Sequence, residues 1–165
     1  RMTEWLVRHA TQMALLAALG AGTMAGLLFA FSNFVMRALS QMLPAAGMEA
    51  MQRINVEIQN PLFLAVFLVT PLLYVGLGVA AWNPHMTGAR VWLLAAAACY
   101  LAGVVGVTAF VNIPLNNALA VLKPEAAASH WPAYVTTWTM WNHVRTVFAL
   151  AALVTTMIGA IVSSR

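Results

Sequence analysis

The sequence predicts an all-α integral membrane protein, a four-helix up-down bundle with short amphipathic helices capping one end. Hydrophobic residues make up 62% and charged residues 7% of the 165 positions, whereas about a quarter of a soluble domain is charged. Four apolar stretches reach the ~20 residues that a membrane span needs. They cover about residues 11–35, 62–81, 91–111 and 144–162, so residues 1–165 read as a single domain whose termini share one side of the membrane.

The first span carries a face of small residues that ends in an amide. Gly22, Gly26, Phe29 and Asn33 follow one another at helical spacing. Small residues on such a face favour close helix contact in a membrane. We expect Asn33 to point into the bundle and to serve as a substrate-binding residue.

An amphipathic helix is predicted between the first two spans, over residues 44–59. Met48, Met51, Ile54 and Ile58 form its apolar stripe. Gln52 and Asn55 lie along the edge of this stripe, where they would line the mouth of the bundle. Asn60-Pro61 then begins the second span, with proline in a first-turn position that suits it.

The third span ends in a second group of amides around Pro114. Asn112 and Asn116 are four residues apart and share one helix face. Two interpretations stay open: an amide satisfies the backbone carbonyl that Pro114 leaves unpaired, or both amides line a cavity.

The fourth span begins with the densest polar cluster. Pro132 suits a helix first turn, and one face then carries Tyr134, Trp138, Trp141, Asn142 and Arg145. A permanently charged guanidinium that enters an apolar span either reaches back to the interface or holds an anion. We favour the anion. The two longer connections both lie on the side away from the termini, so the three polar clusters should converge on one site.

Charge and cysteine content exclude several function classes. The net charge of +4 includes no run of Lys and Arg, which argues against nucleic-acid binding. The single cysteine, Cys99, excludes an internal disulfide and any multi-cysteine metal site. The distribution of Lys and Arg between the loops leans towards cytoplasmic termini, in a bacterial plasma membrane. Membrane lipid is an expected partner, and a homo-oligomer is compatible with the sequence.

Three ordered motifs together resemble the anthrone oxygenase family, small four-helix membrane proteins long carried as a domain of unknown function. The motifs are Gln52-x-x-Asn55 with Asn60-Pro61-x-Phe63, Asn112-x-Pro114-x-Asn116, and Trp138-x-x-Trp141-Asn142-x-x-Arg145. The likeness extends over nearly the whole chain. It implies a membrane oxygenase that oxidises a planar phenolic or anthrone-type molecule with dioxygen.

The implied chemistry assigns roles to these residues. An anthrone has an acidic C–H, and its carbanion can itself reduce dioxygen, so no cofactor is expected. Arg145, Asn142 and the pair Asn112 and Asn116 would stabilise the anion, while Trp138 and Trp141 would stack on the flat ring.

The general base has three candidates in the sequence. His143 fits by residue type, yet on an ideal helix it points about 160° away from Arg145. His130 and Glu57 are the other candidates on the same side of the membrane.

Two alternative functions follow from the same residues. One is a haem- or metal-dependent membrane oxidoreductase, with His143 as a single axial ligand of a haem. The other is a non-enzymatic module or accessory subunit that binds a hydrophobic ligand. A base within reach of the ligand would favour the enzyme. A pocket lined only by Trp, Asn and Arg would favour binding.

Overall fold

A computed structural model describes residues 2–163, and every regular element in this range is a helix. In chain order these elements are α1 (Met2–Arg8), α2 (Ala10–Ala30), η1 (Phe31–Val35), α3 (Met36–Ser40), α4 (Pro44–Glu57), α5 (Pro61–Ala80), η2 (Pro84–Met86), α6 (Arg90–Ala98), η3 (Cys99–Gly106), η4 (Thr108–Asn112), α7 (Ile113–Ala120), η5 (Pro124–Ala126) and α8 (Ala127–Ser163).

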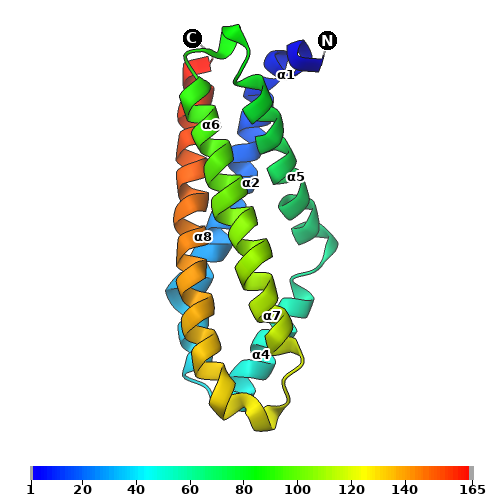
Figure 1. The fold of residues 1–165 in the computed structure, drawn as a ribbon, viewed down its shortest axis with the longest axis vertical. Helices are drawn as coiled ribbons and strands as arrows, with labels where there is room; N and C mark the ends of the chain where they lie inside the picture. The colour runs from blue at the N-terminus through cyan, green and yellow to red at the C-terminus, as the bar shows by residue number, and fades with distance from the viewer. Residues whose placement is uncertain (1, 164–165) are drawn as a thin grey trace.

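Four rods in the described residues are long and apolar enough to cross a membrane, which confirms the predicted all-α membrane bundle. They run over Ala10–Ser40, Pro61–Ala80, Arg90–Ala120 and Pro124–Ser163. The rods alternate in direction, with α1, the end of α8 and the connection between α5 and α6 gathered at one end (Figure 1). Three of the rods exceed the predicted spans, because the polar segments beyond the apolar stretches continue as helix.

The second rod is much shorter than its neighbours. α5 has 20 residues, so it spans about 30 Å, which matches the hydrocarbon thickness of a bilayer. α8 has 37 residues and reaches about 55 Å. In Figure 1, α5 covers only the part of the bundle near the termini, and α4 and α7 occupy the remainder. The polar clusters all lie around this change from α5 to α4.

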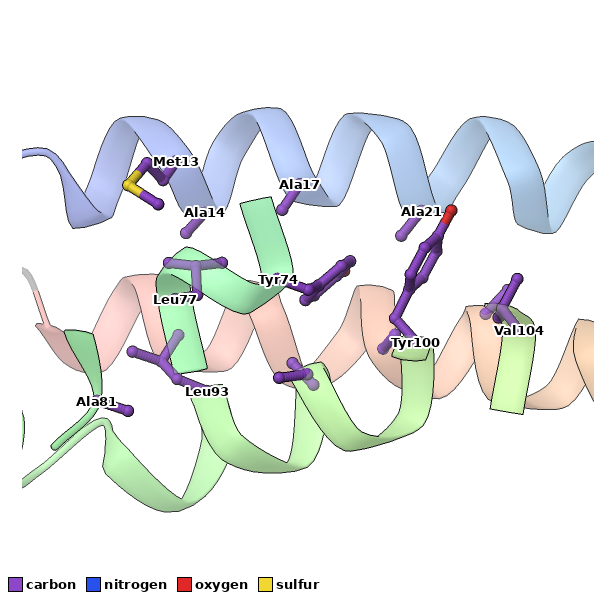
Figure 2. Close-up of a cluster of buried hydrophobic side chains, with 14 of the residues drawn as sticks. Met13, Ala14, Ala17, Ala21, Tyr74, Leu77, Ala81, Leu93, Tyr100 and Val104 are labelled. Carbon is purple, nitrogen blue, oxygen red and sulfur yellow. The ribbon is translucent and has the colours of Figure 1, made fainter. Parts of the chain in front are cut away.

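The core near the termini packs small residues of α2 against two stacked tyrosines. Ala14, Ala17 and Ala21 face the rings of Tyr74 and Tyr100 (Figure 2). The two ring centroids are 4.7 Å apart, and the Tyr74 hydroxyl lies 2.9 Å from Thr156 Oγ1. Alanine side chains leave room for these rings between closely spaced helices.

The predicted glycine face of the first span is wrong. Phe29 is exposed, and a Cβ at Gly26 would meet nothing within 4 Å. The alanines form the buried face instead, and Gly20 provides the close approach, against Thr70 of α5. The pattern misled because alanine and glycine serve equally well as small contact residues in a membrane.

The predicted amphipathic cap helix is confirmed as α4. Met48 and Met51 are buried beneath it, and Asn60 caps the following helix by accepting a hydrogen bond from Phe63 N at 3.0 Å. On the exposed face Arg53 pairs with Glu49 at 2.8 Å. A Cβ at Gly47 would lie 2.6 Å from Leu39 O and 2.9 Å from Trp131 Nε1, so α4 docks closely at this glycine.

Three π-helical segments interrupt the rods, two of them, η1 and η4, near the polar end and one, η3, in the middle of the third rod. η1 follows α2, and η3 and η4 precede the turn that contains Pro114. Wider π-helical turns break the regular ladder of backbone hydrogen bonds and often accompany functional sites. The predicted start of the last helix at Pro132 is wrong by five residues: α8 begins at Ala127, directly after the short helix η5.

Candidate functional site

A cavity of about 370 Å³ opens where α5 gives way to α4. Its size lies within the range of small-molecule pockets, about 300–1,000 Å³. Apolar and aromatic side chains form most of its wall, and amides and one guanidinium converge on it. The lining residues are Met24, Leu27, Leu28, Phe31, Met51, Gln52, Ile54, Asn55, Val56, Ile58, Gln59, Phe63, Leu64, Phe67, Thr108, Ile113, Asn116, Asn117, Ala120, Trp138 and Arg145.

Arg145 is the only charged residue in this lining, and its side chain has only neutral partners. It is 6% exposed. Nη1 donates to Thr108 Oγ1 at 3.1 Å, and Nη2 donates to Asn142 Oδ1 at 2.8 Å. The guanidinium carbon lies 5.2 Å from the ring centroid of Trp138. Nε is buried without a hydrogen-bond partner, and no carboxylate in the described residues pairs with the group.

Asn142 positions this guanidinium instead of lining the cavity. It is fully buried. Its Nδ2 donates to Leu28 O and to Ser32 Oγ, each at 2.7 Å. These donations orient the amide so that its oxygen faces Arg145. Ser32 of η1 thus accepts a hydrogen bond from Asn142, and Asn142 in turn accepts one from Arg145.

Asn116 organises the aromatic side of the cavity. Its Oδ1 accepts hydrogen bonds from Tyr134 Oη at 2.9 Å and from Trp138 Nε1 at 2.8 Å. Trp138 is thereby fixed beside both Arg145 and Phe31, whose ring centroid is 5.6 Å away. Asn112 lies behind this wall. Its Nδ2 approaches Trp138 O at 3.4 Å, while its Oδ1 is buried without a partner.

Asn112 and Asn116 differ in their surroundings, and each of the two interpretations from the sequence agrees with one of them in part. Asn116 lines the cavity, as the ligand interpretation requires. Asn112 does not line it and contacts a backbone carbonyl, although that carbonyl belongs to α8 and not to the turn before Pro114.

α4 supplies two amides to the cavity, both predicted from the edge of its stripe. Gln52 Nε2 donates to Leu119 O at 2.8 Å and to Leu122 O at 3.1 Å, which ties α4 to the end of α7. Asn55 Nδ2 is buried and has no hydrogen-bond partner, although the Asn55 side chain interacts with the Tyr134 hydroxyl. Asn55 Nδ2 and Arg145 Nε are therefore two unused donors beside one cavity.

Three predicted site residues lie elsewhere. Asn33 and His143 are exposed and line a separate, shallow groove between η1 and α8. The expectation that Asn33 points into the bundle is wrong, because the helix face that it shares with Gly26 and Phe29 is exposed. Trp141 is half-buried and lines neither the cavity nor the groove. It lies about 60° from Trp138 around α8, which is enough to turn its ring away from the cavity.

A comparison with protein families settles the relationship of this chain. The model of the anthrone oxygenase family, described as "Anthrone oxygenase", matches residues 56–155. The chain belongs to the anthrone oxygenase family. The matched range contains Thr108, Asn116, Trp138 and Arg145, whereas Gln52 and Asn55 precede it. No curated protein and no solved structure matches the chain.

The cavity of this anthrone oxygenase family member contains no side chain of the usual general-base types. Its lining includes no Asp, Glu or His. His130 is exposed and its Nδ1 lies 3.0 Å from Ala126 O. Within residues 2–163 no three His, Cys, Asp or Glu residues come together as a metal site. A haem ligated by His143 would lie in the outer groove, away from the aromatic cavity.

Sequence reasoning missed two residues that complete the Arg145 environment. Thr108 lies four residues before Asn112, on the face that Asn112 shares with Asn116, so the same periodicity could have found it. Ser32 lies four residues after Leu28, on the buried face of α2, so helical spacing could have found it once that face was identified.

Proposed function

We propose that the protein is a membrane-embedded oxygenase that oxidises a planar phenolic or anthrone-type molecule with dioxygen, without a cofactor. The observation that carries this proposal is Arg145: a buried cation with no carboxylate partner, beside an aromatic cavity. Burying a charge without a counter-ion is costly. A ligand that brings or develops negative charge offsets that cost.

The shape and chemistry of the lining support a flat, acidic ligand. Phe63 and Phe67 stack with centroids 5.6 Å apart on α5, and Phe31 and Trp138 form a second aromatic surface. Aromatic rings bind a planar polycycle through stacking and edge contacts. The free donors Arg145 Nε and Asn55 Nδ2 suit the oxygen on which the substrate's negative charge concentrates.

The proposed reaction balances without an additional reductant. Loss of a proton from the acidic carbon gives an enolate, whose oxygen Arg145 stabilises. The enolate transfers electrons to dioxygen and a carbon–oxygen bond forms, which gives a peroxide after protonation. Loss of water from the peroxide leaves a second carbonyl. The sum is anthrone plus dioxygen to anthraquinone plus water.

The proton acceptor in this proposal is water at the cavity mouth. Arg145 makes the substrate itself more acidic, so a strong base is not required. The sequence-based assignment of His143 as base gains no support from its position in the separate groove. Asn142 acts by positioning Arg145, and Asn116 by positioning Trp138.

Oxygen uptake by the purified protein tests the proposal. An anthrone is added in detergent, and dioxygen loss and quinone formation are followed together above the rate in protein-free micelles. Arg145→Met should reduce the catalysed rate about 10²-fold or more, the size of effect seen when an oxyanion donor is removed. Arg145→Lys should retain part of the rate. Arg53→Met, on the exposed face of α4, is the matched control for loss of a cation.

Equal rates in the wild type and Arg145→Met would overturn the assignment of Arg145. A Soret band in the ultraviolet-visible spectrum of the active protein would overturn cofactor independence and make the histidines ligand candidates.

A second candidate function is favoured by the absence of a base from the lining. The same cavity could bind and shield a flat aromatic molecule without converting it. Binding of an anthrone or quinone that depends on Arg145, with no oxygen uptake above background, would select this function over the oxygenase.

A further inference from the structure

A groove of about 410 Å³, separate from the cavity, lies between η1, α3 and α8. We infer that this groove binds the phosphate headgroup of an anionic membrane lipid. Its lining residues are Ser32, Asn33, Met36, Arg37, Ser40, Val135, Thr136, Thr139, Met140 and His143.

The groove lies at the level of a bilayer surface. α5, whose length matches the hydrocarbon core, begins at Pro61. A membrane span needs about 20 residues. A span of this length that starts with α2 ends near Ala30, and one that finishes at the end of α8 starts near His143. The residues that line the groove lie at these positions or just beyond them. A lipid phosphate is found at this depth.

The polar groups of the groove suit a phosphate. Arg37 and His143 are both exposed along it, and no acidic residue is among its lining. The Thr139 hydroxyl is buried without a hydrogen-bond partner. Guanidinium, imidazole and hydroxyl groups all donate to phosphate oxygens, and each basic side chain near an anionic bilayer surface strengthens lipid binding. Met36, Val135 and Met140 offer an apolar surface on which a glycerol backbone and acyl chain can rest.

The groove is connected to the cavity through a single layer of side chains. Ser32 lines the groove, and its Oγ accepts a hydrogen bond from Asn142, which holds Arg145. It also lies 3.1 Å from Thr146 Oγ1. A lipid in the groove would therefore contact Ser32, which helps to position Arg145 through Asn142. The lipid would not need to enter the cavity.

Native mass spectrometry of the full chain in neutral detergent tests the inference independently of turnover. Short-chain phosphatidylglycerol and phosphatidylcholine are added separately at equal concentration, and inorganic phosphate is added as a competitor. We expect phosphatidylglycerol to bind more tightly than phosphatidylcholine. Arg37→Gln should weaken its binding about fivefold, His143→Gln should weaken it by a smaller factor, and the double variant should bind more weakly than either. Lys123→Gln, which removes an exposed cation at the same end of the bundle, should leave binding unchanged.

Three outcomes would overturn the inference. Equal binding of the two lipids would remove the anionic headgroup as the ligand. Undiminished phosphatidylglycerol binding by the double variant, with a wild-type melting temperature, would place the lipid elsewhere. Displacement of phosphatidylglycerol by an equal concentration of inorganic phosphate would identify free phosphate, and not a lipid, as the ligand.

Discussion

Arg145 carries its charge into the bundle with neutral partners on every side that the structure describes. A threonine hydroxyl, an asparagine oxygen and an indole face contact it, and Nε contacts none of them. Together these contacts orient the guanidinium but do not neutralise it. Burial without a counter-ion costs the folded protein free energy, but it leaves the charge of Arg145 available to a ligand.

Trp138 should matter more to ligand binding than Trp141, although both belong to one sequence motif. Trp138→Phe removes the hydrogen bond to Asn116 and weakens the contact with Arg145, so anthrone affinity should fall about 2–20-fold. Trp141→Phe is the matched control and should stay within about twofold of the wild type, because Trp141 lies outside the cavity. Quenching of protein fluorescence by the ligand measures both affinities. Equal losses in the two variants would contradict the assignment of the cavity.

At the residue scale, helical periodicity in α8 predicted much of the site. Tyr134, Trp138, Asn142 and Arg145 are all buried along one face, as their spacing indicated. In the first rod Gly26, Phe29 and Asn33 share one face as predicted, but that face is exposed, and Ser32 instead continues the buried face of Leu28. Spacing shows which residues share a face, whereas in a helix that is apolar all round it does not show which face is buried.

Among the elements, the short α5 and the docked α4 create the cavity. α5 begins at Pro61, short of the end that the longer rods reach, and α4 lies in the region beyond it (Figure 1). Gln52 and Asn55 of α4 line the cavity. Gln52 fastens α4 to the end of α7 by two hydrogen bonds. The cavity is thus the space that a full-length second span would have filled.

The docking of α4 depends on the absence of a side chain at Gly47. Gly47→Ala would press a methyl group against Leu39 O and the Trp131 ring, so it should destabilise the cap by about 1–3 kcal/mol and lower the melting temperature in detergent. Gly26→Ala is the matched control in another helix. Its Cβ would meet open space, so a gain of up to about 1 kcal/mol is expected. A neutral Gly47→Ala would show that α4 does not pack as described.

The existence and order of the helices were predictable, because each long apolar stretch of the sequence forms a membrane-spanning rod and the apolar stripe of residues 44–59 forms α4. Their ends were not. The polar residues after the third span and before the fourth lowered the apparent length of both spans, yet they continue as helix over Ile113–Ala120 and from Ala127 onward. Hydropathy indicates which residues lie in the hydrocarbon of the bilayer. The helix itself extends as far as its backbone hydrogen bonds continue, which can be beyond that region.

Across the whole molecule, packing and polarity are separated along the long axis. The end near the termini is an apolar core of alanines and tyrosines (Figure 2). The other end holds the cavity, the groove and the cap. The convergence of the polar clusters at this end was predictable from the up-down order of the spans. Their division between an inner cavity and an outer groove follows the faces of α8, where helical spacing already separates His143 from Arg145.

The acidity of a bound anthrone tests the central role of Arg145 most directly. Under nitrogen, where oxidation cannot proceed, the absorbance of the anthrone is followed against pH with wild-type protein, with Arg145→Met and in protein-free micelles. If Arg145 stabilises the anion, the C–H acid should be at least about tenfold stronger in the wild type than in micelles, and the variant should lose this gain. An anthrone that ionises at the same pH in all three samples would contradict the account.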